Sequence, residues 1–338
     1  MSRLTEVIKE YRTLGIREQI DYDKFYLYSL ITHSTAVEGS TVTEIENRLL
    51  FDEGISPNKP LTEQLMNLDL KRAYEEAFNL AAKHQDYSVK LMCHLAGMVM
   101  KNTGTEYRTM LGSFSSAEGE LRLLNVTAGR GGKSYMSYQK VPQRLEDFCN
   151  WLNVQRKSAA SWDIDKIYEM SFMAHYNLVY IHPWADGNGR MARLLMNMLQ
   201  VEFGVIPSIV KKDSRDEYIR SLAESQDTGD ASSFIDFMLN HHIKNLEETI
   251  HEYRESIADD TLNLGNDTLN DTINLSDKEN RVLELIKSDN DISIADIVDR
   301  TGFSRPTVTR AISVLKDRKI IDRAGARKNG HWVIVKKE

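Results

Sequence analysis

The residues best suited to chemistry lie in one stretch between two apolar segments. The stretch reads His182-Pro183-Trp184-Ala185-Asp186-Gly187-Asn188-Gly189-Arg190-Met191-Ala192-Arg193. Its glycines tolerate positive φ and allow backbone N–H groups to converge on one point. A loop of this kind at the start of a helix favours a bound anion, because unpaired donors and the helix dipole both attract negative charge.

The charged side chains of this stretch indicate a phosphate ligand. Arg190 and Arg193 are three residues apart, so they share one face of the helix expected from about Met191 to Phe203 and can bind two phosphates of one ligand. Asp186 suits Mg²⁺, which proteins usually hold with one or two carboxylates together with phosphate oxygens. His182 is the side chain whose unperturbed pKa suits proton transfer at neutral pH.

Each of these features alone is more often structural, but their order is specific. The string His-Pro-aromatic-x-Asp-Gly-Asn-Gly-Arg-x-x-Arg resembles the signature of the Fic family, whose members mostly transfer AMP from ATP to protein hydroxyls. One position differs, since Trp184 stands where the family usually has Phe, which keeps a large apolar anchor under the loop. The resemblance covers about residues 30–245.

The resemblance implies a role for each residue of the motif, with ATP and Mg²⁺ as cofactors. The nucleotide-binding residues are Gly187, Asn188, Gly189, Arg190 and Arg193. The three loop N–H groups and the Asn188 side-chain amide would hold the α- and β-phosphates, and the two arginines the distal phosphates. Asp186 would bind the Mg²⁺ that bridges the phosphates. His182 would take the proton from a Ser, Thr or Tyr hydroxyl of a protein as that hydroxyl attacks the α-phosphorus.

A second motif lies near the N-terminus, in His33-Ser34-Thr35-Ala36-Val37-Glu38-Gly39-Ser40. Ser34 and Glu38 are four residues apart and share a helix face, and Gly39 can end the helix in a left-handed conformation. The Ser-x-x-x-Glu-Gly pattern resembles the inhibitory helix of many Fic proteins. It implies that Glu38 pairs with Arg193 in place of the ATP γ-phosphate, since an arginine binds a carboxylate or a phosphate equally well.

Composition limits the class of protein. The chain has 338 residues, 41% hydrophobic and 28% charged, which is typical of a soluble globular protein. No apolar run approaches the ~20 residues that span a membrane, and the first residues lack the apolar core of a signal peptide. With two cysteines, a disulfide framework or cysteine metal cluster is not expected. We therefore expect a cytoplasmic protein that binds no membrane.

The fold class predicted is mostly α. We expect an N-terminal helical region with the inhibitory helix at 1–100, a Fic-like core at 101–250, a linker at 251–275 and a winged helix-turn-helix at 276–338. Leu121–Val126 and Tyr135–Tyr138 flank a glycine-rich turn and predict a β-hairpin. In Fic-like proteins this hairpin is a flap that holds the target segment as an added strand. Gly104, Tyr107 and Arg108 are expected in a loop before it.

The linker and the C-terminal region have their own patterns. Asp-Thr-Leu/Ile-Asn occurs at residues 260, 267 and 271, which indicates low complexity. Residues 304–337 then carry ten Lys or Arg against two Asp, although the net charge of −7 argues against a wholly nucleic-acid-binding protein. Three short helices followed by a two-stranded wing resemble a winged helix-turn-helix. Its third helix would present Arg305, Thr309 and Arg310 to a DNA major groove, or the domain would serve protein contacts or dimerisation.

The sequence thus predicts a protein adenylyltransferase that Glu38 inhibits, acting on a protein hydroxyl that can be its own. Two alternatives stay open. One is a transcriptional regulator whose Fic-like core senses nucleotide without chemistry. The other is a Fic enzyme that transfers another group or removes AMP. A combined model, in which a dimer represses its own gene at a palindromic operator, would join the two activities.

Overall fold

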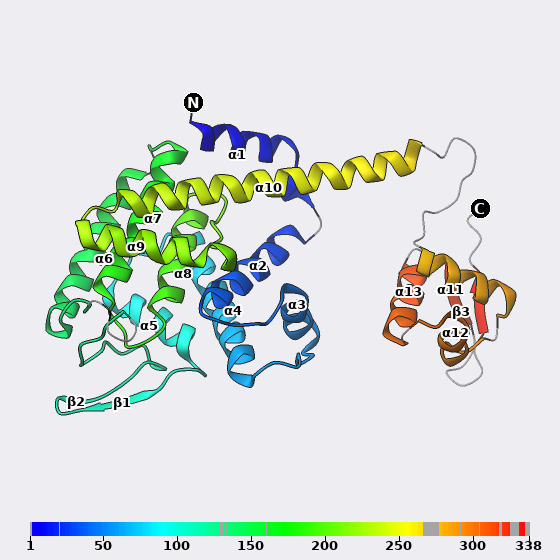
Figure 1. The fold of residues 1–338 in the computed structure, drawn as a ribbon, viewed down its shortest axis with the longest axis horizontal. Helices are drawn as coiled ribbons and strands as arrows, with labels where there is room; N and C mark the ends of the chain where they lie inside the picture. The colour runs from blue at the N-terminus through cyan, green and yellow to red at the C-terminus, as the bar shows by residue number, and fades with distance from the viewer. Residues whose placement is uncertain are drawn as a thin grey trace. The chain divides into compact units, whose positions relative to one another are not determined.

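The computed structural model describes residues 2–19, 21–128, 132, 134–159, 161–265, 277–290, 292–303, 305–317, 320–324 and 331–334. The described chain is mostly helical with short antiparallel strand pairs, so the predicted fold class is confirmed (Figure 1). It divides into two compact units, Met1–Asp259 and Asp260–Glu338.

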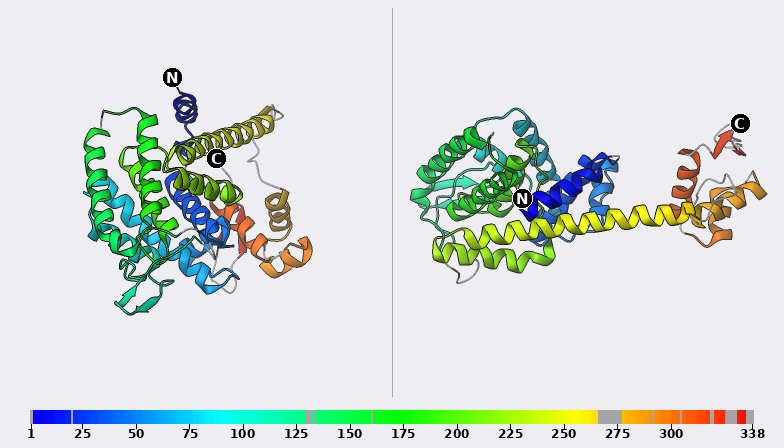
Figure 2. Two further views of the ribbon diagram at one scale, coloured as in Figure 1. Left: turned by 60° about the vertical axis from the view of Figure 1, so that its left-hand side comes forward. Right: turned by 90° about the horizontal axis from the view of Figure 1, so that it is seen from above.

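The first unit holds the motif residues, and α8 (Asn188–Glu202) is its central helix. Every residue of α8 from 190 to 200 is buried. A helix that is buried on all sides must be covered by neighbours on all sides, and α7, α4, α5 and α2 pack against it. These helices belong to the blue, cyan and green part of the ribbon in Figure 2. The helices of this unit are α1 (Arg3–Thr13), α2 (Tyr22–Val37), α3 (Glu44–Glu53), α4 (Leu61–Ala82), α5 (Val89–Met100), α6 (Val141–Ala159), α7 (Ile164–Ile181), α8, α9 (Arg215–Thr228) and α10 (Ser232–Gly265), with short 3-10 turns at Ile16–Glu18, Tyr138–Lys140 and Lys212–Ser214.

Polar residues at the helix ends explain several boundaries. Thr43 and Glu46 form a reciprocal capping box at the start of α3, which satisfies two otherwise unpaired N–H groups. The Asp163 side chain accepts a hydrogen bond from the Lys166 N–H and so starts α7. After α2, Gly39 takes a φ of 102°, a conformation that L side chains rarely adopt.

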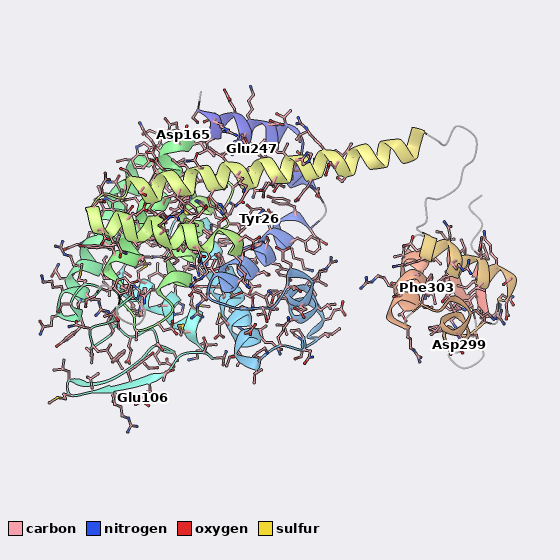
Figure 3. The ribbon with its side chains drawn as sticks, viewed as in Figure 1. Tyr26, Glu106, Asp165, Glu247, Asp299 and Phe303 are labelled. Carbon is pink, nitrogen blue, oxygen red and sulfur yellow. The ribbon has the colours of Figure 1, made fainter. Side chains whose placement is uncertain are left out.

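The α1 helix is tied to the body at its first residues. The Ser2 hydroxyl donates to both carboxylate oxygens of Asp165 at the start of α7, at 2.6 and 2.8 Å. The Arg3 guanidinium donates to Glu247 of α10. Both acids lie beside α1 in Figure 3.

The hairpin of this unit lies earlier in the chain than predicted. Strands β1 (Glu106–Thr109) and β2 (Gly112–Ser115) pair antiparallel, in the region expected to be a loop. Gly112 at φ 127° closes their turn, and Tyr107 stacks on Phe114 across the pair. The segments predicted as the flap hairpin do fold back on each other, since the Tyr135 N–H donates to the Val126 carbonyl. They form no named strand pair, and the adjoining Thr127 and Ser134 form one isolated bridge. We keep the name flap for residues 121–138.

The last helix of the unit is longer than expected. The sequence predicts a linker from residue 251, whereas α10 continues to Gly265. Neither glycine nor proline occurs between Ser232 and Leu264, so nothing in this segment interrupts a helix. Residues 251–265 of the predicted linker are therefore helical, and 266–275 lie outside the described residues.

The second unit has its own apolar core. Helices α11 (Asp277–Ser288), α12 (Ile294–Thr301) and α13 (Arg305–Asp317) precede the antiparallel pair β3 (Ile321–Ala324) and β4 (His331–Ile334). Ser293 and Asp296 cap α12 reciprocally, and Gly302 ends it in the left-handed conformation. An apolar stripe of α13 is buried together with Trp332 of β4; it consists of Val308, Ile312 and Leu315.

Candidate active site

His182 ends α7 in an unusual backbone conformation. Its φ of 51° and ψ of 62° are left-handed, and its N–H donates to the Leu178 carbonyl. The following proline cannot continue the helix, so the chain turns away at this point. The Nδ1 atom of His182 lies 3.3 Å from the Val179 carbonyl oxygen. A carbonyl only accepts, so this contact favours a proton on Nδ1 and leaves Nε2 as the acceptor.

The electrostatic surroundings keep His182 uncharged at neutral pH. Burial disfavours the imidazolium and lowers the pKa of His182 to about 4. The nearby Arg122 charge lowers it further, whereas the Val179 hydrogen bond and the Glu38 charge oppose the shift. A neutral imidazole with a free Nε2 can accept a proton.

The loop after His182 is anchored by Trp184. Its side chain is 1% exposed and its Nε1 donates to the Gly119 carbonyl at 3.0 Å. The Asn188 side chain, 3% exposed, accepts from the Trp184 N–H and donates to the Trp184 carbonyl. The predicted contact of the Asn188 amide with phosphate is therefore corrected, because this amide is buried and closes the loop on itself.

Truncating this anchor should destabilise the first unit. We expect Trp184→Ala to lower the free energy of unfolding by about 3–5 kcal/mol, as for other buried large-to-small changes. Trp184→Phe, which keeps an aromatic ring, should lose about half of that or less. Urea unfolding followed by circular dichroism measures both, and equal losses in the two variants would contradict the anchor role.

The start of α8 has unpaired donors, as the loop predicted. Gly187 is the N-cap at φ 79°, and no side chain caps the helix. The Gly187 N–H donates to its neighbour Asp186, but within the described residues the backbone N–H groups of Asn188, Gly189 and Arg190 have no acceptor. The φ of Gly187 is one that L side chains rarely adopt, and a Cβ there would also lie 2.7 Å from the Met100 sulfur, so this position favours glycine.

Arg190 is a buried cation without a strong partner. It is 4% exposed, and its contacts are the Val99 carbonyl at 3.5 Å, the Met100 sulfur at 2.9 Å and the Asp186 carboxylate at 3.8 Å. Its Nε has no hydrogen-bond partner. Burial lowers the pKa of Arg190. Since an unpaired buried donor is costly, this arrangement favours an added anion.

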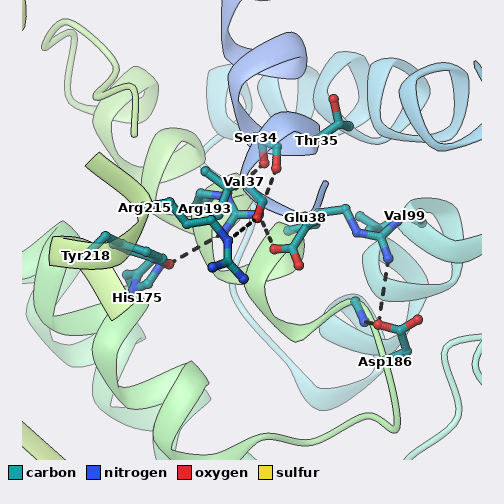
Figure 4. Close-up of polar contacts among 12 residues, drawn as sticks. Ser34, Thr35, Val37, Glu38, Val99, His175, Asp186, Arg193, Arg215 and Tyr218 are labelled. Atoms are coloured by element: carbon teal, nitrogen blue, oxygen red, sulfur yellow. Dashed lines mark hydrogen bonds and ion pairs between the residues drawn. The ribbon is translucent and has the colours of Figure 1, made fainter. Parts of the chain in front are cut away.

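Arg193 is fully paired, and its partners come from the end of α2 (Figure 4). Its Nε donates to the Ser34 hydroxyl and its Nη2 to the Ser34 carbonyl, both at 2.9 Å. The same Nη2 lies 2.5 Å from Glu38 Oε1. The structure thus contains the contact expected of the inhibitory motif, with two further bonds from Ser34.

The Glu38 carboxylate occupies the anion position at the start of α8. A Cβ on Gly189 would lie 2.6 Å from Glu38 Oε1, so the carboxylate is in close contact with the first turn of the helix. Burial raises the pKa of Glu38, but the charge and hydrogen bond of Arg193 outweigh it, and the pKa is lowered overall. The position is therefore shaped for negative charge, as helix starts are.

Tyr218 and His175 extend this cluster into the core. The Tyr218 hydroxyl lies 2.8 Å from His175 Nε2 and 3.5 Å from Arg193 Nη1. Burial holds the pKa of His175 well below its ordinary value, so His175 is neutral and accepts from the tyrosine. His175 is completely buried and belongs to the core of this unit.

Two protein-family profiles match the sequence of this chain. The sequence profile of the Fic/DOC family matches residues 86–200. Residues 86–200 are a Fic/DOC domain. The profile of the MarR family matches residues 273–330, which identifies the second unit as a MarR-family winged-helix domain.

Named relatives and solved structures agree with the Fic/DOC domain. Protein adenylyltransferase fic-1 of Caenorhabditis elegans is 29% identical over 251 residues, covering 73% of this chain and 45% of that protein. The chain thus spans about half the length of the curated relatives it matches. A Fic-domain signalling protein of Bacteroides thetaiotaomicron has the same fold, with a TM-score of 0.60, 19% identity and 75% and 97% coverage. A Fic family protein of Desulfovibrio desulfuricans matches all of this chain and 97% of its own, at a TM-score of 0.55 and 18% identity.

Two further residues of the Fic/DOC domain, which the motifs in the sequence do not include, contact the motif loop. Arg122 is 1% exposed and donates to three carbonyls, those of His182, Leu124 and Met136. It therefore joins the flap to the motif loop. The Tyr135 ring stacks on the His182 imidazole, with centroids 3.6 Å apart and planes 17° apart. Only the arginine inside the apolar run Leu121-Arg122-Leu123-Leu124 could have drawn attention.

The remaining predicted site residues lie where a ligand can reach them. Asp186 is 60% exposed in its side chain. Arg305, Thr309 and Arg310 are exposed on α13.

No helix among the described residues is both long and apolar enough to cross a membrane. The described part of the chain also holds no cluster of three or more His, Cys, Asp or Glu that could bind a metal ion.

Proposed function

We propose that the Fic/DOC domain transfers AMP from ATP to a Ser, Thr or Tyr hydroxyl of a protein. The observation that carries this proposal is the anion position at the start of α8, lined by two buried arginines and joined through one short loop to a neutral histidine. The relatives named protein adenylyltransferases support it.

The proposed reaction assigns one task to each group. The free N–H groups of residues 188–190 and the unpaired donor of Arg190 bind phosphate oxygens. The hydroxyl oxygen of the target attacks the α-phosphorus and gives its proton to Nε2 of His182. The bond from the α-phosphorus to the bridging oxygen breaks, and pyrophosphate leaves with that electron pair. The target then carries AMP through a phosphate ester.

The residues present fit a Mg²⁺ ion that the nucleotide brings. One oxygen of Asp186 accepts from the Gly187 N–H, and the exposed carboxylate retains capacity for a metal. One carboxylate with phosphate oxygens and water is an ordinary Mg²⁺ donor set. When bound, Mg²⁺ neutralises phosphate charge and stabilises the leaving pyrophosphate.

We place the nucleoside in a cavity of about 670 Å³ beside the flap. Its walls include Tyr135, which stacks on His182, and Ile181, which precedes His182. Asn177 and Gln226 add two amides, groups that can hydrogen-bond a base. This volume is typical of sites for molecules of nucleotide size.

We propose that the Glu38–Arg193 pair keeps the enzyme inactive. An ATP γ-phosphate and the Glu38 carboxylate would compete for Arg193, so nucleotide would bind without the alignment that transfer needs.

Both cysteines are free thiols, which supports a reducing compartment such as the cytoplasm.

One experiment tests the activity directly. The Glu38→Gly protein is incubated with ATP and Mg²⁺, alone and with cell lysate, and protein masses are measured. An added AMP on itself or on lysate proteins is the expected result, and parallel samples with UTP and CDP-choline show whether another group is transferred. Absence of every adduct would favour the alternative, a nucleotide sensor without chemistry.

We further propose that the MarR-family domain binds DNA as a dimer at a palindromic site. Arg305, Thr309 and Arg310 share the exposed face of α13, and the opposite face is buried. A helix of this kind places its outer side chains in the major groove. Joined to the transfer activity, this would make the protein an enzyme that regulates transcription.

The DNA proposal predicts that Arg305 and Arg310 together contribute to DNA affinity. Replacing both Arg305 and Arg310 with alanine should weaken binding to a randomised duplex pool at least tenfold and flatten its salt dependence, because fewer phosphate charges are neutralised. Lys287→Ala, on the exposed face of α11, serves as the control. Fluorescence anisotropy at several salt concentrations measures both, and unchanged binding in the double variant would exclude α13 as the recognition helix.

A further inference from the structure

The Tyr135–His182 stack joins the flap to the proposed proton acceptor. The two ring centroids are 3.6 Å apart and the planes nearly parallel, at 17°. A stacked ring covers one face of the imidazole and leaves the edge, where both nitrogens lie, uncovered by that ring. Both side chains are half-buried.

The backbone on each side of Tyr135 is held in place. The Tyr135 N–H donates to the Val126 carbonyl at 3.0 Å. Ser134 forms the isolated bridge with Thr127, and the carbonyl of Met136 accepts from Arg122. Arg122 also donates to the His182 carbonyl at 2.7 Å. One buried guanidinium therefore binds the backbone of His182 and of Met136, the residue that follows Tyr135.

We propose that Tyr135 is a positioning residue for His182: its ring excludes water from one face of the imidazole and fixes the imidazole plane beside the phosphate site. Its role in transfer rests on the proposed function, whereas its effect on His182 does not. The tyrosine hydroxyl has no part in this role, so phenylalanine should replace it.

The stack also has a consequence for proton binding by His182. Removing the ring lets water reach the imidazole, and water stabilises the charged form. Three groups act besides the ring: Arg122 opposes protonation, whereas Glu38 on α2 and the Val179 carbonyl favour it. These stay in place when Tyr135 changes. The pKa of His182 should therefore rise from about 4 toward its ordinary value of about 6.5 when the ring is lost.

The direct test is an NMR titration of the full-length protein without nucleotide. The His182 Cε1–H signal is assigned by its loss in His182→Ala, and its pH dependence is recorded in the wild type, Tyr135→Phe, Tyr135→Ala and Tyr135→Thr. We expect the midpoint to rise by more than one pH unit in the alanine and threonine variants and to stay low in Tyr135→Phe. Tyr138→Ala, a flap tyrosine outside the stack, is the matched control and should titrate like the wild type.

A kinetic test extends the result to transfer. Transfer is measured in a Glu38→Gly background. A base with a pKa near 6.5 is about one-tenth unprotonated at pH 5.5. For Tyr135→Ala, kcat/KM for transfer should therefore fall about tenfold between pH 8 and 5.5, and in Tyr135→Phe it should change far less.

The two readouts separate the two claims. If His182 titrates alike in Tyr135→Ala, Tyr135→Thr and the wild type, the positioning role is excluded. If the midpoint shifts as expected but no variant transfers AMP, the positioning role stands and the proposed function fails. The threonine variant keeps β-propensity, so the test does not depend on alanine at a flap position.

Discussion

Replacing Glu38 with glycine is expected to raise AMP transfer to protein by on the order of 10–100-fold. The Glu38 carboxylate lies 2.5 Å from Arg193 Nη2 and contacts the first turn of α8. A hydrogen bond between charged groups contributes about 1.5–3 kcal/mol, and about 1.4 kcal/mol corresponds to tenfold. Releasing Arg193 to the nucleotide should therefore increase transfer by this factor. Incorporation of label from α-labelled ATP measures it.

Two variants make this result specific. Ser34→Ala removes the contact to Arg193 Nε but leaves the Ser34 carbonyl and Glu38 in place, so its gain should be smaller. Glu53→Gly removes an exposed acid on α3 and should change nothing. If purified Glu38→Gly binds ATP but incorporates no more label than wild type, Glu38 is not the inhibitor.

Mild acidification should not reproduce the effect of the mutation. Because the pKa of Glu38 is lowered in the folded protein, its carboxylate stays charged even when the pH falls below the ordinary pKa of a glutamate. The stabilisation from the Arg193 pair is present above the unfolded pKa of Glu38 and is lost only as pH falls through the lowered folded pKa. Wild-type protein should therefore remain inactive at pH 5.5.

Local chemistry in the sequence was sufficient for the motif and for several helix ends. Capping residues, glycine and proline act through the few residues around them, so Thr43, Ser293 and Gly302 could be interpreted without knowing the fold. The loop between α7 and α8 follows from the same local rules. The glycine-containing loop likewise predicts an anion site at the start of α8.

Long-range partners could not be predicted in the same way. The two segments that flank the glycine-rich turn of the flap predict a hairpin, but the Arg122 guanidinium takes the carbonyls of Leu124 and Met136 that strand pairing would otherwise use. Strand propensity depends strongly on such tertiary contacts. The Asn188 side chain was misassigned for a related reason, because the sequence gives no measure of its burial under Trp184.

Replacing His182 with alanine is expected to reduce transfer by on the order of 10²–10⁴ while ATP binding persists. A positioned base contributes about this factor, and the His182 imidazole is the ring that stacks on Tyr135 of the flap. The groups that face the anion position are Arg190, Arg193 and the N–H groups at the start of α8. Since none of them belongs to His182, nucleotide affinity should change by less than about twofold, far below the loss in rate.

The comparison is made in the Glu38→Gly background, where transfer is measurable. Equilibrium dialysis gives the Kd for ATP, and single-turnover transfer of label gives the rate. His94→Ala removes an exposed histidine of α5 and controls for the loss of a histidine as such. It should retain both the Kd for ATP and the transfer rate. Near-normal turnover without the imidazole would show that another group accepts the proton. A large loss in rate at unchanged Kd would mean that His182 acts after nucleotide binding.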